Sequence, residues 1–454
     1  MSFQVINPAT GETVKEIPAW DDANVEAAIS QVAEATPAWA NTPLSERCDL
    51  MHKAAQVLRD NKDEYARTIT IEMGKLINDS RAEVEKCALV CDYYAEHGPE
   101  FLKDEPIASD AGKSYVAYLP LGSVLAVMPW NFPFWQVFRF AAPALVAGNT
   151  GLLKHASNVP ESALAIEAVF HKAGFPEGVF RTLMIRASQV QKVIEDPRVH
   201  AVTLTGSEPA GRQVAATAGA NLKKSVLELG GSDAFIVLED ADLDETVKIA
   251  VISRFLNTGQ SCIAAKRFIV VDAIAEDFLT RFKAGAEALQ TGDPLDEMTT
   301  LAPMARQDLR DELHQQVQDT VAAGAVAVTG CEPIEGAGAY YQPSILDGVQ
   351  PGMRAYEEEL FGPVAIVIRA RDEEDAIRIA NDSPYGLGGS IWTGDTARGE
   401  RLARKMQSGA TFINGLVKSD PRLPFGGVKN SGYGRELSHH GIHEFVNAKT
   451  IWIK

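Results

Sequence analysis

Three residues combine a side-chain type with a position in the chain that could serve catalysis. Cys262 lies in the segment NTGQSC, between a predicted helix and a predicted strand, and a loop cysteine beside small and polar residues can be accessible and ionisable. Glu228 ends the apolar run in SVLELGG, where partial desolvation raises the pKa of a carboxyl group and makes it a candidate general base. Asn131 follows a predicted strand, and its amide could donate a hydrogen bond to a developing oxyanion.

Taken singly, each of these residues also fits a purely structural role. Cys262 could be a buried thiol, Glu228 an edge glutamate in a turn, and Asn131 the cap of a helix that begins near Pro133. Cys87 and Cys91 stand four residues apart in a predicted helix, so they share one face and are interpreted as packing residues.

A weaker signal points to a bound phosphate. The segment TGSEPAGR places Gly206 and Gly211 after a predicted strand and at a helix start, which fits anion binding at a helix N-terminus. The spacing is not GxGxxG, so a plain strand-to-helix turn explains the segment equally well.

The elements that must position these residues change in character along the chain. Residues 22–100 have apolar side chains at helical spacing. Beyond them, strand-like runs alternate with helices, which indicates a parallel sheet with crossover helices and ligands at the carboxyl ends of the strands. The expected strands are SVLAVMP, TGLLKH, FRTLMI and AVTLTG, and the helices between them are PFWQVFRFAAPALVAG, ESALAIEAVFHKAG and EPAGRQVAATAGA. A second alternating unit begins near Leu227.

Composition excludes several classes of protein. The chain has 454 residues and a formal charge of −18, which argues against general binding of nucleic acid or of anionic membranes but leaves room for a small anionic ligand at local positive groups. Five cysteines without a CxxC pair indicate neither a disulfide framework nor a zinc site, and free thiols suit a reducing cytosol. The start MSFQVINPATGE shows no targeting signal, and no apolar run reaches about 18 residues. We therefore expect a cytoplasmic protein without metal, nucleic-acid or membrane partners.

Together the motifs are far more specific than any one of them. MPWNFP, LLKHAS, LTGS, LELGGSD, NTGQSC, EELFGPV and PFGGVKNSGYGRE occur in the order found in NAD(P)-dependent aldehyde dehydrogenases. The resemblance spans nearly the whole chain, and within that superfamily the chain resembles the shorter bacterial succinate-semialdehyde dehydrogenases.

The resemblance implies an α/β fold in three parts. A Rossmann-type cofactor domain would occupy residues 1–227, with 112–124 contributing to an oligomerisation arm. A catalytic α/β domain would occupy residues 228–430, and residues 431–454 would return to the cofactor domain and add the oligomerisation strand. Because exposed edge strands usually find a partner, we expect a homodimer or homotetramer.

The resemblance also assigns roles in oxidising succinate semialdehyde to succinate. Cys262 matches the nucleophile that forms a thiohemiacetal and then a thioester, Glu228 the general base, and Asn131 the oxyanion donor beside the backbone N–H of Cys262. The implied cofactor-binding residues are Pro129, Trp130, Lys154, Ser157, Gly206, Ser207, Leu229, Glu359 and Phe361.

Cofactor preference depends on Lys154-His155-Ala156-Ser157. Many NAD-preferring relatives carry a glutamate where this chain has Ser157. A carboxylate there would repel a 2′-phosphate, whereas Ser157 and Lys154 would not. We therefore expect NADP as the preferred cofactor, with NAD also possible. His155 replaces a proline that is common in the family.

Substrate preference depends on Arg139. Trp135 and Arg139 are four residues apart, so they share a helix face, and an arginine suits a fork-like grip on a substrate carboxylate. A surface salt bridge is the structural alternative. Some succinate-semialdehyde enzymes have a second arginine where this chain has Leu256, so glutarate semialdehyde and other ω-carboxy aldehydes stay open as substrates. Further expected substrate contacts are Ser261, Ser419 and Phe425.

Three alternatives remain beside this interpretation. The chain could be a dehydrogenase of broad specificity for aliphatic or aromatic aldehydes. It could be a CoA-acylating enzyme, against which the water-activating Glu228 argues. It could also be a non-catalytic NADP-binding protein, against which the intact set of Cys262, Glu228 and Asn131 argues.

Overall fold

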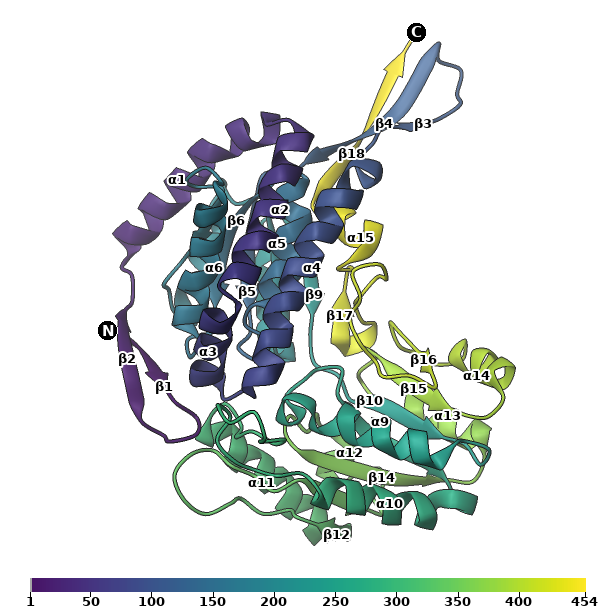
Figure 1. Ribbon diagram of the computed structural model, residues 1–454. Helices are drawn as coiled ribbons and strands as arrows, with labels where there is room; N and C mark the ends of the chain where they lie inside the picture. The colour runs from purple at the N-terminus through teal and green to yellow at the C-terminus, as the bar shows by residue number, and fades with distance from the viewer. Residues whose placement is uncertain (1) are drawn as a thin grey trace.

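The computed structural model describes residues 2–454. The chain opens with a hairpin that the sequence did not predict, formed by β1 (Ser2–Ile6) and β2 (Thr13–Pro18). The expected helical region follows as α1 (Asp22–Asn41), α2 (Leu44–Asp60), α3 (Lys62–Met73) and α4 (Ile77–Phe101). Cys87 and Cys91 are fully buried in α4, as expected of packing residues. Side chains of α2, α3 and α4 enter the core on one face of the first large sheet, where these helices lie in Figure 1. Four buried residues of α1 enter the core on the other face: Val25, Ala28, Ile29 and Val32.

That first sheet has six strands in the order β17-β9-β8-β5-β6-β7, parallel except for β17. Alternate residues of β5 enter different cores, with Val124 and Ala126 in one and Leu125 in the other, so both faces are buried. The strands are β5 (Ser123–Met128), β6 (Thr150–His155), β7 (Phe180–Thr182), β8 (Ala201–Thr205), β9 (Lys224–Glu228) and β17 (Gly432–Tyr433). The helices of this part are α5 (Trp135–Val146), α6 (Pro160–Ala173), α7 (Val190–Glu195) and α8 (Glu208–Ala220).

The second large sheet has seven strands in the order β12-β13-β14-β11-β10-β15-β16, parallel except for β12. Its strands are β10 (Asp233–Val237), β11 (Ala265–Val271), β12 (Val326–Thr329), β13 (Ser344–Asp347), β14 (Val364–Ala370), β15 (Gly389–Trp392) and β16 (Phe412–Ile413). Its helices are α9 (Leu243–Phe255), α10 (Ala275–Glu287), α11 (Gln307–Ala322), α12 (Arg354–Glu357), α13 (Glu373–Asn381) and α14 (Thr396–Ala403). Ala234 and Ile236 enter one core and Phe235 and Val237 another, so this sheet too is covered on both faces.

A third sheet of three strands, in the order β18-β4-β3, projects from the body of the molecule (Figure 1). Its strands are β3 (Glu105–Pro106), β4 (Lys113–Pro120) and β18 (Val446–Ile453), and the short helix α15 (Ser438–His443) precedes β18. β18 pairs with β4 along its whole length, from Val446 opposite Pro120 to Ile453 opposite Lys113. The other edge of β18 has no strand beside it in residues 2–454.

The two large parallel sheets confirm the expected α/β fold. All four strands predicted in the first unit are present, although FRTLMI forms only the three-residue β7, and α8 covers residues 208–220 as predicted. The chain crosses from the first large sheet to the second through Leu229–Ser232, between β9 and β10. None of the helices in residues 2–454 combines the length and the apolar composition that a bilayer-spanning helix requires.

Candidate active site

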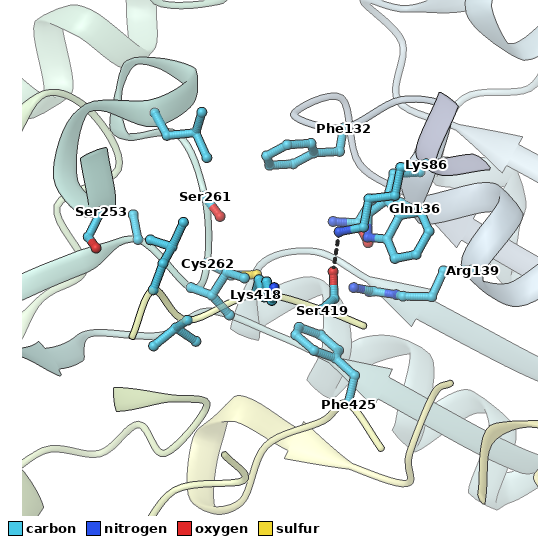
Figure 2. A pocket seen from close by; sticks show the side chains of 16 residues that line it. Lys86, Phe132, Gln136, Arg139, Ser253, Ser261, Cys262, Lys418, Ser419 and Phe425 are labelled. Carbon is cyan, nitrogen blue, oxygen red and sulfur yellow. Dashed lines mark hydrogen bonds between the residues drawn. The ribbon is translucent and has the colours of Figure 1, made fainter. Parts of the chain in front are cut away.

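Cys262 lies where two cavities meet. Cavity A, of about 110 Å³, opens on one side of Cys262, and Figure 2 shows its lining. Cavity B, of about 260 Å³, opens on the other side. The two linings have Cys262 and Gln136 in common. A ligand in either cavity can therefore reach the same thiol.

The loop before Cys262 has an unusual backbone. After α9 ends at Phe255, three successive residues adopt left-handed angles: Asn257 (φ 53°), Thr258 (φ 55°) and Gly259 (φ 70°). Asn257 and Thr258 are strained in this conformation, which is sparsely populated by residues other than glycine. Position 259 favours glycine because of its left-handed φ. It also has no room for a side chain, which would collide with the carbonyl oxygen of Gly362.

Two buried cations stabilise this loop. Arg254 Nη2 donates to the carbonyl oxygens of Gly259 (2.6 Å) and Gly362 (2.7 Å). Lys266 Nζ donates to the carbonyl oxygens of Ser261 (2.8 Å) and Cys262 (2.7 Å). The strained turn is thereby held by charge-assisted hydrogen bonds, which are stronger than neutral ones.

The Cys262 thiol is a weak acid in this setting. Burial raises its pKa to about 12, against the opposing positive charges of Lys266 and Arg139. Only the thiolate is an effective nucleophile, so attack requires a base or further positive charge close to the sulfur.

Asn131 lines cavity B and is 4% exposed. Its Nδ2 donates to the carbonyl oxygen of Gln260 at 3.0 Å, which leaves the second N–H of that amide free for a ligand. It does not cap α5, so that structural alternative is wrong. The cap is Glu83, whose Oε1 accepts from the backbone N–H groups of Phe134 (2.9 Å) and Trp135 (3.0 Å).

Glu228 is buried, with neither carboxyl oxygen hydrogen-bonded within residues 2–454. Burial, followed by the nearby Glu436, raises the pKa of this carboxyl well above its usual range. A Cβ at Gly426 would lie 2.6 Å from Glu228 Oε1, so the glycine provides the space that the carboxyl group occupies. Glu228 lines neither cavity. The carboxyl group has the raised pKa that the sequence predicts, but it must turn to act beside Cys262.

Seven of the nine expected cofactor-binding residues line cavity B: Pro129, Trp130, Gly206, Ser207, Leu229, Glu359 and Phe361. Trp130 and Phe361 meet edge to face, with ring centroids 5.8 Å apart. The Glu359 carboxylate is fixed by Lys266 Nζ at 2.9 Å and by the backbone N–H of Gly231 at 3.2 Å. Gly206 and Ser207 precede α8, whose N-cap Ser207 makes no side-chain hydrogen bond to the helix.

The other two expected cofactor residues lie at the end of β6: Lys154 is within the strand and Ser157 follows it. Lys154 is 7% exposed and forms no side-chain hydrogen bond or ion pair in residues 2–454, and burial lowers the pKa of its ammonium group. Ser157 is exposed. An unpaired ammonium and an uncapped helix start suit the phosphate groups of a dinucleotide.

His155 has a structural role that the sequence did not reveal. Its Nε2 lies 2.8 Å from the carbonyl oxygen of Pro133, and its Nδ1 accepts from the backbone N–H of Ala156. Burial lowers the pKa of the imidazole to about 4, so the ring is neutral. His155 therefore ties the end of β6 to the segment that carries Asn131.

All five expected substrate-contact residues line cavity A: Trp135, Arg139, Ser261, Ser419 and Phe425. Arg139 is only 2% exposed, so it forms no surface salt bridge, and that alternative is wrong. Instead its Nε forms a buried ion pair with Glu436, its Nη2 donates to Thr205 at 3.3 Å, and its guanidinium lies 4.5 Å from the ring centroid of Phe425.

Several residues around Cys262 were missed by sequence analysis. Lys86 and Gln136 line cavity A, Lys266 stabilises the Cys262 loop, and Glu436 pairs with Arg139. Gln136 stands in α5 beside Trp135, so its helix position could have suggested it. Glu436 ends the motif PFGGVKNSGYGRE, but nothing in that motif indicated a pair with Arg139. Lys86 lies in a helix outside the quoted motifs, and no sequence signal connected it with Cys262.

Comparison with known proteins identifies the class to which this fold and site belong. The model of the aldehyde dehydrogenase family matches residues 1–451. The chain belongs to the aldehyde dehydrogenase family.

Similar proteins carry more specific names. A protein of Synechocystis sp. named probable succinate-semialdehyde dehydrogenase, NADP(+), is 52% identical over 453 residues that span 100% of both chains. Succinate semialdehyde dehydrogenase Sad of Escherichia coli, named for NAD(P)+, is 51% identical over 98% of this chain and 97% of its own length. A solved structure of succinic semialdehyde dehydrogenase from Streptococcus pyogenes, in complex with NADP+, has a TM-score of 0.98 at 40% identity, with 99% of both chains covered.

Proposed function

We propose that this protein oxidises succinate semialdehyde to succinate, with NADP+ as its preferred cofactor and NAD+ as a possible one. The observation that carries the proposal is the meeting of cavities A and B at Cys262. Cavity A contains the positively charged Lys86 and Arg139, which suit an aldehyde with a carboxylate at its far end. The names of the similar proteins support the same substrate.

The first step belongs to Cys262 and Asn131. The thiolate attacks the aldehyde carbon, a C–S bond forms, and the carbonyl electron pair moves to the oxygen. The free N–H of Asn131 Nδ2 and the backbone N–H of Cys262 are the donors for this oxyanion, and one such donor contributes about 2.7–4 kcal/mol in other enzymes. When bound, the nicotinamide supplies the hydride acceptor that brings the aldehyde carbon to the oxidation level of an acid.

The second step belongs to Glu228. A water molecule attacks the acyl group on Cys262, its proton passes to the Glu228 carboxylate, and the C–S bond breaks to regenerate the thiolate. Glu228 must leave its buried position beside Gly426 to do this. Turning toward a hydrated cavity would also lower the pKa that burial has raised, so the movement that positions the base would ionise it.

The residues near Lys154 support NADP+ as the preferred cofactor. The Lys154 ammonium has no partner in residues 2–454, and the exposed Ser157 leaves the adjoining corner without a carboxylate. A 2′-phosphate would find a cation there and no repelling charge.

The remaining expectations belong to the same proposal. The division into residues 1–227, 228–430 and 431–454 is supported by the two large sheets, whose strands come mainly from the first two of these parts. Homo-oligomer formation is supported by the unpaired edge of β18. The free state of all five cysteines supports a reducing cytosol as the site of action.

An aldehyde panel tests the proposal. We would measure NADPH and NADH formation with succinate semialdehyde, glutarate semialdehyde, butanal and benzaldehyde. We expect the highest kcat/KM with succinate semialdehyde and NADP+. Cys262→Ala should lose at least about 10³-fold in kcat, whereas Cys48→Ala, which removes a thiol packed in α2, should stay active. A strong preference for NAD+, or equal use of butanal and succinate semialdehyde, would contradict the proposal.

A further inference from the structure

Lys86 is a cation in cavity A with no acidic partner. It comes from α4, and its Nζ donates to Ser419 Oγ at 2.8 Å and lies 4.1 Å from the ring centroid of Trp135. Within residues 2–454 it forms no ion pair. Figure 2 shows the Lys86 and Ser419 side chains pointing toward one another, with Arg139 beside them.

The acidic groups near Lys86 are already engaged elsewhere. Glu83 forms a buried ion pair with Lys75 and also caps α5. Asp420 pairs with Arg422 at 2.6 Å. The other ionisable groups that act on Lys86 are Arg139, which repels its charge, and the Cys87 thiol, which is fully buried. The protein therefore leaves the Lys86 charge uncompensated, which is costly for a largely buried ammonium group until a ligand supplies the counter-charge.

Arg139 differs from Lys86 in this respect. Its positive charge is offset by the buried carboxylate of Glu436, and its guanidinium is also committed to Thr205 and Phe425. Leu256, the position where some related enzymes have a second arginine, contributes only an apolar surface to cavity A. Lys86 is partly buried, and of these two cations in cavity A it is the one whose charge is available to a ligand.

We propose that the Lys86 ammonium, with the Ser419 hydroxyl as a second donor, directly binds the carboxylate of the ω-carboxy aldehyde substrate. This inference rests on the proposed function. Trp135 lies under the ammonium and limits its hydration, which strengthens a charge-assisted hydrogen bond. Arg139 would act beside it by orienting Phe425.

Removal of the Lys86 charge should affect one substrate class selectively. The test compares succinate semialdehyde with butanal, which has the same number of carbons and no carboxylate. In Lys86→Met, we expect KM for succinate semialdehyde to rise about 10- to 100-fold, with kcat and the kinetics of butanal changed less than about threefold. Lys86→Arg, which keeps the charge, should recover most of the loss.

An exposed lysine away from both cavities provides the control. Lys53 of α2 is exposed and lines neither cavity A nor cavity B. Lys53→Met removes one charge of the same kind, and we expect it to change KM for succinate semialdehyde less than about threefold, because exposed charges are screened.

The pH dependence gives a readout that a merely structural role would not produce. Burial, followed by the charge of Arg139, lowers the pKa of Lys86 to about 8. The wild-type KM for succinate semialdehyde should therefore rise above about pH 8, as the ammonium loses its proton. The same KM should be nearly flat with pH in Lys86→Met and should stay low to a higher pH in Lys86→Arg.

The outcomes separate this inference from the function on which it rests. If the wild type uses butanal as well as succinate semialdehyde, the proposed function and the role of Lys86 are both wrong. If the wild type prefers succinate semialdehyde but Lys86→Met weakens both substrates equally, or no more than Lys53→Met does, only the role of Lys86 is wrong.

Discussion

Cys262 is held in place by a cation that bonds to its carbonyl oxygen and leaves its sulfur free. Lys266 donates to the backbone of Ser261 and Cys262 and also pairs with Glu359, which lines cavity B. One ammonium group therefore connects the Cys262 loop with a residue that lines cavity B. Its charge only partly offsets the effect of burial, and the Cys262 thiol keeps a pKa of about 12.

This raised pKa predicts how Cys262 reacts with an alkylating reagent. Because only the thiolate reacts, the rate of modification by iodoacetamide in the absence of cofactor should rise about tenfold per pH unit between about pH 7 and 9, without a plateau. Mass spectrometry of the labelled peptides measures this rate. The buried Cys48, Cys87, Cys91 and Cys331 serve as internal controls and should stay unlabelled in the folded protein. A plateau below about pH 8 would show that the thiol is far more acidic than its surroundings imply.

The residues that we propose for the reaction stand out in the sequence, but the ion pairs around them do not. Cys262, Glu228 and Asn131 stand in short motifs whose order is specific. Arg139, in contrast, is paired with Glu436, a residue almost three hundred positions away whose local sequence carries no sign of that contact. Ion pairs of this kind arise from the packing of distant segments, so they become visible only in the folded chain.

At the scale of elements, two helices near the site, α5 and α6, are capped at their N-termini by glutamates from other helices. Glu83 of α4 accepts from the first N–H groups of α5, and Glu72 of α3 accepts from Glu161 and Ser162 at the start of α6. The N-cap residues themselves, Phe134 and Val159, make no side-chain hydrogen bond. Helix capping is usually predicted from a nearby Ser, Thr, Asp or Asn. This rule suggested Asn131 as the cap of α5, whereas the observed cap is Glu83, which lies 51 residues before Phe134.

The contacts of Glu83 with α5 and Lys75 predict how its substitution changes the free energy of unfolding. Glu83→Gln should lower the free energy of unfolding by about 3–5 kcal/mol, because it leaves Lys75 buried without a counter-charge. Thermal unfolding should show a midpoint several degrees lower, and kcat/KM should fall because α5 carries Trp135 and Arg139 into cavity A. Glu85→Gln is the matched control on α4. It removes a partly exposed pair with Arg59, and we expect a loss of about 0.5 kcal/mol or less. Equal effects of the two substitutions would refute the role given to Glu83.

At the scale of the whole molecule, the last segment of the chain adds strands to two sheets that earlier segments form. β17 joins β9 in the first large sheet, and β18 then pairs with β4 in the projecting sheet. Sequence pattern predicted the alternation of strands and helices, and the resemblance predicted the return. Neither predicted the hairpin of β1 and β2, although the connection between these strands contains the turn-favouring pair Asn7-Pro8 and Gly11.

The exposed edge strand β18 of the projecting sheet predicts how charged substitutions there change the oligomeric state. Trp452 and Ile453 are about half exposed on β18, which has a free edge in residues 2–454. If this edge joins subunits, Trp452→Lys with Ile453→Lys should lower the molar mass measured by light scattering after size-exclusion chromatography, because charges on an edge strand oppose pairing. Leu222→Lys is the control, since Leu222 is 96% exposed in the turn after α8. A wild-type protein that is already monomeric at micromolar concentration would contradict the proposed assembly.

In the proposed function, the two cavities that meet at Cys262 give the substrate and the cofactor separate routes to the thiol. Their linings share Cys262 and Gln136, and every other lining residue belongs to one side or the other. A dicarboxylic acid that lingers in cavity A after the reaction would therefore compete with incoming aldehyde, while nucleotide exchange in cavity B continues. The rate of turnover would then respond to two independent ratios, acid to aldehyde on one side and reduced to oxidised nucleotide on the other.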